Sequence, residues 1–136
     1  MSQENVAHIK AAFEAWNAGD MDALREIHDP DVVLRMPVGW PERGPFVGRD
    51  AVMREFEQLR ETFDADAFEL ISDFIDVGDR VAVRFIWLGA GQGPGSKVEV
   101  TGVYTVRNGR TLAIDHFWDH AEALEAVGLS EQDISA

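Results

Sequence analysis

The sequence predicts an α+β protein in which a curved antiparallel sheet wraps three N-terminal helices as a cone-shaped barrel and a short C-terminal helix follows. Apolar residues repeat mostly at helical spacing in the first half of the chain and mostly alternate at strand spacing in the second half. Asn108-Gly109 is a strong signal for a two-residue hairpin. Helices gathered on one side of consecutive strands favour the α+β class. A strongly twisted sheet also curls, and helices laid across its concave side leave a conical cavity. With 136 residues, we expect one domain, 1–136.

Composition excludes several classes of function. The net charge of −13 argues against nucleic acid and against anionic membrane surfaces, both of which attract clustered Lys and Arg. The chain has no cysteine, so disulfides, thiolate catalysis and cysteine-based metal sites are excluded. The N-terminus lacks the basic and apolar regions of a signal peptide, and no apolar run reaches membrane-span length. We therefore expect a cytoplasmic protein.

The first third of the chain predicts two helices and a strand. One helix is expected over residues 3–18, and a second, short helix follows the N-cap Asp20. A strand over 32–36 ends at Pro37. The buried stripes of the two helices are expected to be Val6, Ile9, Phe13 and Trp16, and then Met21, Leu24 and Ile27.

A loop rich in proline and glycine, residues 38–48, carries Trp40. Long loops with aromatic residues often cover binding sites, although Trp40 could equally anchor a surface loop. Asp50 is the expected cap of a third helix, whose apolar stripe is Val52, Phe56, Leu59 and Phe63.

The second half predicts the sheet. The apolar residues from Phe68 and over 74–77 predict a strand. The next strand, over 81–88, is apolar on both faces. Both faces must then be covered, one by helices and the other by a partner subunit. The glycine-rich residues 89–96 lack the spacing of phosphate-binding loops and predict a hairpin tip. Strands over 98–106 and 111–118 and a helix over 121–127 complete the chain.

Residues 114–120 concentrate two acids, two imidazoles and two large aromatic side chains at the end of the last strand. Alternation places Asp115 and Asp119 on one face and His116 and His120 on the other. A carboxylate beside aromatic groups is typical of sites where a pKa is raised for acid–base work. The two imidazoles would lie roughly 13 Å apart in a strand, too far to share one ion, so we predict no metal site.

Several segments together resemble the nuclear transport factor 2-like superfamily, most closely its SnoaL-like branch. The resemblance covers nearly the whole chain. It rests on the segments 16–20 (WNAGD), 30–33 (PDVV), 46–52 (FVGRDAV), 108–110 (NGR) and 119–129 (DHAEALEAVGL). It implies a barrel with a pocket on its concave side and a homodimer formed through the outer face of the sheet. The same fold hosts many functions, so the resemblance does not select one.

The resemblance also allows the catalytic residues of each enzyme group in the superfamily to be compared with this sequence. The base of ketosteroid-isomerase-like members falls on Met36 here and their tyrosine falls on Ala12, so that machinery is absent. The predicted strands lack the paired Arg and Asp of epoxide hydrolases. The acid–base Asp of SnoaL-like polyketide cyclases falls on Asp119, which also stands where a helix N-cap belongs.

We predict a protein that binds a small hydrophobic molecule without a cofactor. The expected pocket walls are Phe13, Trp16, Trp40, Phe56 and Trp87, with Asp115 as a polar contact. As an alternative, a cofactor-free cyclase, dehydratase or isomerase would use Asp119 as its base and His116 or Tyr104 as its hydrogen-bond donor. A third alternative is a dimerisation or interaction domain with a filled core.

Overall fold

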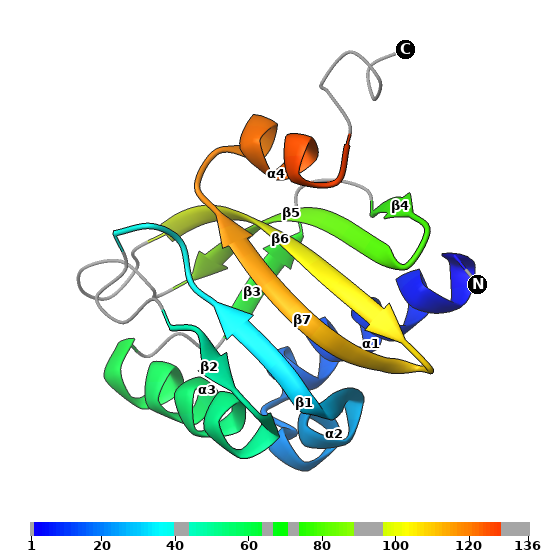
Figure 1. Ribbon diagram of the computed structural model, residues 1–136. Helices are drawn as coiled ribbons and strands as arrows, with labels where there is room; N and C mark the ends of the chain where they lie inside the picture. The colour runs from blue at the N-terminus through cyan, green and yellow to red at the C-terminus, as the bar shows by residue number, and fades with distance from the viewer. Residues whose placement is uncertain (1, 40–43, 64–66, 71–73, 89–96, 129–136) are drawn as a thin grey trace.

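The computed structural model describes residues 2–39, 44–63, 67–70, 74–88 and 97–128. These residues form four helices and seven strands (Figure 1). The helices are α1 (Ser2–Ala18), α2 (Met21–Ile27), α3 (Arg49–Phe63) and α4 (His120–Ala126). The strands are β1 (His28–Arg35), β2 (Phe46–Val47), β3 (Ala67–Leu70), β4 (Ile75–Val77), β5 (Arg80–Leu88), β6 (Lys97–Arg107) and β7 (Arg110–Phe117).

The seven strands form one sheet in the order β2-β1-β7-β6-β5-β3, and β4 also pairs with β5. All pairs are antiparallel except β1 and β7, which run parallel with Leu34 opposite Ile114. The α+β class is confirmed, but the prediction of a purely antiparallel sheet is wrong. Parallel neighbours need a long connection, and here most of the chain lies between the two strands.

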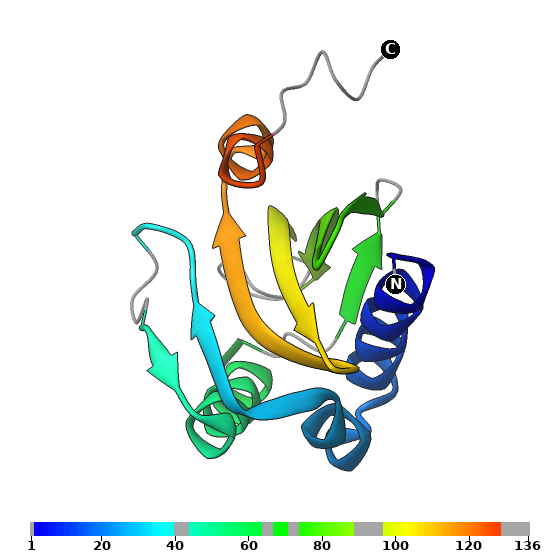
Figure 2. The same ribbon diagram turned by 45° about the vertical axis from the view of Figure 1, so that its right-hand side comes forward.

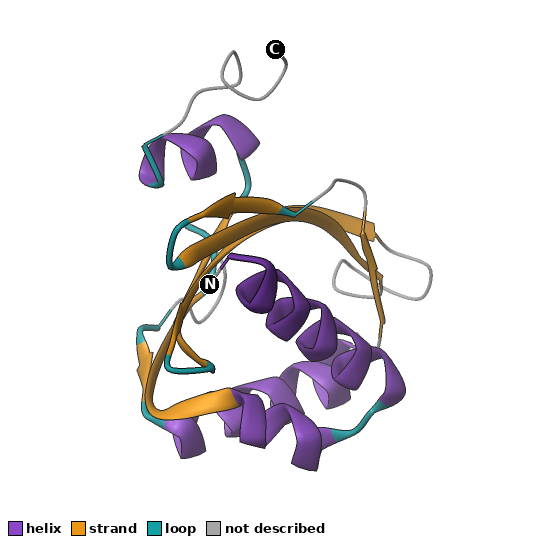
Figure 3. Ribbon diagram, turned by 90° about the vertical axis from the view of Figure 1, so that its right-hand side faces the viewer, coloured by secondary structure: helices purple, strands orange, loops and turns teal. Residues whose placement is uncertain are grey.

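The helices lie on both sides of the sheet but not equally. Helices α1 and α3 lie along the concave side, where α1 contacts β3, β4 and β5 and α3 contacts β1 and β2 (Figures 2 and 3). Helix α4 lies on the opposite side, against β5, β6 and β7 (Figure 3). The curved sheet therefore has an inner face with three helices and an outer face with one.

Local signals explain several boundaries. The Asp20 carboxylate accepts a hydrogen bond from the Ala23 amide at 3.1 Å, the N-cap that the sequence predicts for α2. Asn108 and Gly109 have φ angles of 55° and 75°, and this left-handed pair makes the tight turn between β6 and β7. None of the described helices combines the length and apolarity needed to cross a membrane.

Alternation along the strands divides the two faces. Val81, Val83, Phe85 and Trp87 of β5 are buried in the main core with the apolar stripes of α1 and α3. Ala82 and Val103 belong to a second, smaller core under α4. The predicted coverage of β5 on both faces is therefore provided, at least in part, by the C-terminal helix.

The end of α1 is tied to the edge of the sheet by Asn17. Its side-chain oxygen accepts a hydrogen bond from the Phe68 amide at 2.7 Å, and its side-chain nitrogen donates one to the Phe68 carbonyl at 3.2 Å. The two bonds position the short strand β3 so that the Phe68 ring stacks on Trp16.

Candidate functional site

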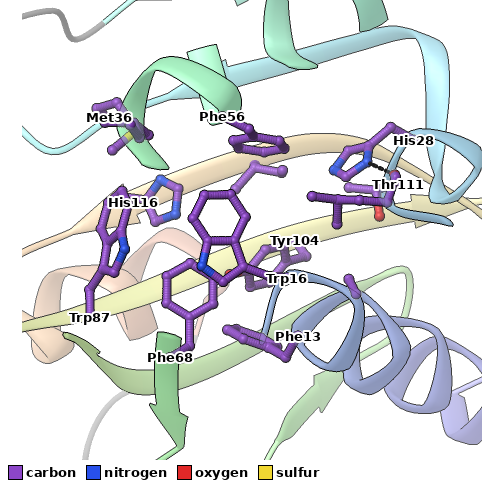
Figure 4. A pocket seen from close by; sticks show the side chains of 14 residues that line it. Phe13, Trp16, His28, Met36, Phe56, Phe68, Trp87, Tyr104, Thr111 and His116 are labelled. Atoms are coloured by element: carbon purple, nitrogen blue, oxygen red, sulfur yellow. Dashed lines mark hydrogen bonds between the residues drawn. The ribbon is translucent and has the colours of Figure 1, made fainter. Parts of the chain in front are cut away.

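A pocket lies between the inner face of the sheet and the helices (Figure 4). Its walls combine α1, α2 and α3 with β1, β3, β5, β6 and β7. It is mainly apolar, and its cavity volume is about 50 Å³. The aromatic side chains that line it are Phe13, Trp16, Phe56, Phe68, Trp87 and Tyr104.

Trp16 is the centre of the aromatic group. Phe68 stacks on it with ring centroids 4.9 Å apart, and Phe56 and Trp87 meet it edge to face. The Arg60 guanidinium lies 5.0 Å from the ring centroid and donates a hydrogen bond to the Trp16 carbonyl at 2.9 Å. The indole is therefore fixed on several sides, with 2% of the residue exposed.

The indole nitrogen of Trp16 is buried and, within the part of the chain that the structure describes, has no hydrogen-bond partner. A buried N–H without an acceptor costs about 1–3 kcal/mol. In Figure 4 this nitrogen lies on the side of the indole that faces Trp87 and His116. Trp16 thus gives the pocket a fixed donor whose natural complement is an acceptor atom on a bound molecule.

His116 places an imidazole in the pocket from β7 (Figure 4). Its Nδ1 lies 3.0 Å from the Arg35 carbonyl oxygen of β1, and since a carbonyl only accepts, Nδ1 carries the proton. Burial lowers the pKa of His116 below 6.5, although the Arg35 carbonyl and Asp115 act in the opposite direction. At neutral pH the ring is uncharged, and Nε2 is its proton acceptor.

Gly102 leaves room for the Tyr104 ring on β6. A Cβ atom added at Gly102 would lie 2.7 Å from the Tyr104 hydroxyl oxygen, so the ring folds across this glycine. Gly102 is the residue opposite His116 in the β6–β7 ladder. Burial raises the pKa of Tyr104, so the phenol keeps its proton and can donate a hydrogen bond.

His28 is a pocket residue that the sequence reading did not predict. It is 2% exposed at the start of β1, and its Nδ1 donates to the Leu24 carbonyl at 2.6 Å. Burial lowers its pKa to about 4, so the ring is neutral at pH 7. In the sequence, its position at the end of a predicted helix indicates only a favourable contact with the helix C-terminal dipole. Phe68 was missed as a wall because a short strand with few apolar neighbours gives little periodicity.

The structure brings together six of the nine residues that the sequence nominated for the site: Phe13, Trp16, Phe56, Trp87, Tyr104 and His116. Trp40 falls outside the described residues. The placement of Asp115 at the pocket is corrected. This residue points to the outer face, where Arg35 donates to its carboxylate at 3.3 Å. Alternation forces this outcome once His116 faces inward.

Asp119 also lies outside the residues that line the pocket. Its exposed carboxylate accepts a hydrogen bond from the Ala121 amide at 2.9 Å and caps α4. The geometry thus gives Asp119 the N-cap position, one of the two roles that the sequence left open. Next to it, His120 is hydrogen-bonded at Nδ1 to the Thr101 hydroxyl, 3.0 Å away on the outer face. Among the described residues, no cluster of His, Asp and Glu could hold a metal ion.

Comparison with protein families decides the classification. Residues 9–114 match the model of the SnoaL-like domain, which is more than half of the chain. The chain belongs to the SnoaL-like domain family. No curated protein matches this SnoaL-like chain closely enough to count as a relative.

Solved structures share the fold. Bal32a, from a soil-derived mobile gene cassette, is 21% identical, with 85% of this chain and 88% of that chain covered and a TM-score of 0.76. A putative polyketide cyclase from Sinorhizobium meliloti is 25% identical over 81% of this chain and 93% of its own, with a TM-score of 0.69. An NTF2-like protein of unknown function from Burkholderia pseudomallei is 22% identical, with 94% and 99% covered and a TM-score of 0.71. The NTF2-like fold is thus shown, and most such relatives have no assigned function.

Proposed function

We propose that this SnoaL-like domain binds a small hydrophobic molecule that carries a hydrogen-bond acceptor such as a carbonyl. The observation that supports it is the buried Trp16 donor, without a described partner, in a pocket lined by aromatic rings. Apolar walls favour an apolar ligand, and one fixed donor favours an acceptor on it. In this proposal the curved sheet and the N-terminal helices form the walls of a cone around the ligand.

The cavity volume limits the size of the ligand. About 50 Å³ is room for a few water molecules, since one water needs on the order of 10–15 Å³ by the same kind of measure. Sites for drug-sized ligands are larger, about 300–1,000 Å³. The proposed ligand therefore has only a few non-hydrogen atoms, or the aromatic side chains rearrange around a larger one.

Butanone and its isosteric alkene, in which a methylene group replaces the carbonyl oxygen, test the proposal. Both have the same shape, but only the ketone can accept a hydrogen bond from Trp16. We expect butanone to shift the Trp16 indole N–H resonance downfield in an NMR titration, whereas the alkene leaves it nearly in place. Trp16→Phe keeps an aromatic ring and removes the donor, so it should weaken butanone binding by roughly five- to tenfold and the alkene by less.

An interaction domain with a filled core is the second candidate, and the small cavity favours it. If neither probe perturbs the pocket resonances at millimolar concentration, the filled-core alternative stands and the binding proposal fails. The predicted acid–base role of Asp119 stays a prediction. The similarity to a putative polyketide cyclase supports it, and the capping position of the carboxylate does not.

We also propose the homodimer through the outer face of the sheet. Half-buried Phe117 and Ile86 on this face support it. The ion pair between Arg84 and Glu99 on the same face would then become part of the interface. Sedimentation at micromolar concentration should give the mass of a dimer, and a monomer would contradict the proposal.

A further inference from the structure

The two ends of the pocket differ in the hydrogen bonds that they can make. At one end the Trp16 donor faces Trp87 and His116 (Figure 4). His28 and Thr111 line the other end, where they are partners in the ladder between β1 and β7. Thr111 lies near the start of β7 and His116 near its end. A ligand held at the Trp16 indole therefore extends toward His28 and Thr111.

The hydrogen bond to the Leu24 carbonyl decides which nitrogen of His28 faces a ligand. Nδ1 lies 2.6 Å from this carbonyl oxygen and carries the proton, because a carbonyl only accepts. Burial lowers the pKa of His28 to about 4, so at neutral pH the second nitrogen, Nε2, has a lone pair. In Figure 4 this nitrogen points away from the dashed bond, toward the middle of the pocket. His28 therefore presents a hydrogen-bond acceptor to the cavity.

The imidazole of His28 is held in place by its neighbours. The residue is 2% exposed, and the Phe56 ring meets it edge to face with centroids 5.5 Å apart. Arg49 donates a hydrogen bond to the backbone carbonyl of His28 at 3.5 Å. A side chain that is already ordered loses little conformational entropy when a ligand binds, so this acceptor is preorganised.

Thr111 provides a second acceptor beside His28. The residue is 1% exposed, and its hydroxyl oxygen lies 2.9 Å from Nε2 of His8. A hydroxyl has one hydrogen and two lone pairs, so the Thr111 oxygen keeps a lone pair in either tautomer of His8. This end of the pocket can thus accept hydrogen bonds, whereas Trp16 at the other end donates one.

We propose that the ligand carries a hydroxyl group at the end opposite its carbonyl, and that this hydroxyl donates to His28 Nε2 with the Thr111 oxygen beside it. The ligand class is then a short hydroxy ketone or hydroxy aldehyde. A buried acceptor that faces a methyl group loses the hydrogen bond that water gives it, so the pocket discriminates against a ligand without the hydroxyl. The inference rests on the proposed binding of a carbonyl compound at Trp16.

The pair 4-hydroxybutan-2-one and pentan-2-one tests the inference on the wild-type protein. The two ketones have the same shape and differ only in a hydroxyl that replaces a methyl group. We expect the hydroxy ketone to bind about three- to tenfold more tightly in NMR titrations at neutral pH. Purely apolar recognition would favour the methyl group instead, so equal or tighter binding of pentan-2-one overturns the inference. The nitrogen resonance of His28 Nε2 should move upfield with the hydroxy ketone and stay in place with pentan-2-one.

Two variants assign the preference to its residues. His28→Phe keeps a ring beside Phe56 and removes Nε2, so it should abolish the preference for the hydroxy ketone. Thr111→Val keeps the side-chain shape and should reduce the preference by about two- to fivefold. The matched control Thr101→Val removes an equally buried hydroxyl, which is bonded to His120 on the outer face, and should bind both ketones as the wild type does. An unchanged preference in Thr111→Val would remove Thr111 from the proposal.

The outcomes separate the two proposals. If both ketones shift the Trp16 indole resonance and bind equally well, the hydroxyl site is overturned and the binding function stands. If neither ketone binds, the proposed function fails and the hydroxyl site fails with it. A shift of the His116 Nε2 resonance in place of that of His28 would put the hydroxyl at the opposite end of the pocket and overturn the assignment to His28.

Discussion

The two faces of the sheet differ in how their polar side chains are paired. On the outer face Arg84 donates to Glu99 at 2.7 Å, and Arg35 donates to Asp115 at 3.3 Å. On the inner face the side chains are mostly aromatic or aliphatic, and Trp16 retains a donor with no described partner. The outer face satisfies its charges with each other and with solvent, whereas the inner face keeps hydrogen-bonding capacity unused. This difference indicates that the inner face is where a small molecule would be recognised.

Loss of an inner aromatic residue should have the largest effect. We expect Trp16→Ala to reduce the free energy of unfolding by about 3–5 kcal/mol, because it leaves a cavity among Phe56, Phe68 and Trp87. On the outer face, Arg84→Ala should cost about 1 kcal/mol or less, because an exposed ion pair contributes little. Urea unfolding of both variants measures the difference. Similar losses would contradict the contrast between the faces.

Lowering the pH should have the second-largest effect, because it reduces the free energy of unfolding through a buried histidine on the inner face. The folded pKa of His28, about 4, lies below its unfolded value near 6.5, so the unfolded chain binds the proton first. Stability from neutral His28 is fully present above pH 6.5 and is lost as the pH falls through about 4; the loss is about 3 kcal/mol. Burial is the main cause, and His8 and Arg49 add to it by charge repulsion.

The non-titrating variant His28→Asn isolates this effect. Asparagine can still donate to the Leu24 carbonyl, but it does not titrate. The unfolding free energy of the variant should therefore change less between pH 6.5 and pH 4 than that of the wild type. Denaturant unfolding at several pH values gives the two slopes. Parallel curves would show that His28 is not the group that titrates.

A change at the rim of the outer face should have the smallest effect. Asp119→Ala removes the N-cap of α4 and should cost about 1 kcal/mol. Butanone binding should be unaffected, since the carboxylate does not line the pocket. Denaturant unfolding of the variant measures its stability, and titration of the same sample with butanone measures its binding. A loss of binding without a loss of stability would place Asp119 in the site.

Much of the fold is encoded locally and could be predicted. Asp20 and Asn108-Gly109 act through their own backbone neighbours, so their roles as cap and turn are visible in the sequence. The parallel pairing of β1 with β7 could not be seen, because it joins Leu34 to Ile114 across most of the chain. No short-range pattern reports a contact between such distant residues.

The candidate site was predictable only in part. Alternation correctly separates Asp115 from His116, but it cannot say which of them faces the helices. That choice depends on how β7 packs against α1 and its neighbours. His28 was missed for a similar reason, since its burial arises from tertiary contacts with Phe56 and not from its place after a helix. Phe13 and Trp16, large aromatic residues on an amphipathic helix, do line the pocket.

Asn17 has a consequence for the protein at high concentration. Phe68 turns its backbone N–H and carbonyl away from β5, at the free edge of the sheet, where a strand from another molecule could pair. The Asn17 side chain occupies both groups, so it shields the edge from intermolecular strand addition. The residue that positions a pocket wall therefore also protects this edge of the sheet against aggregation.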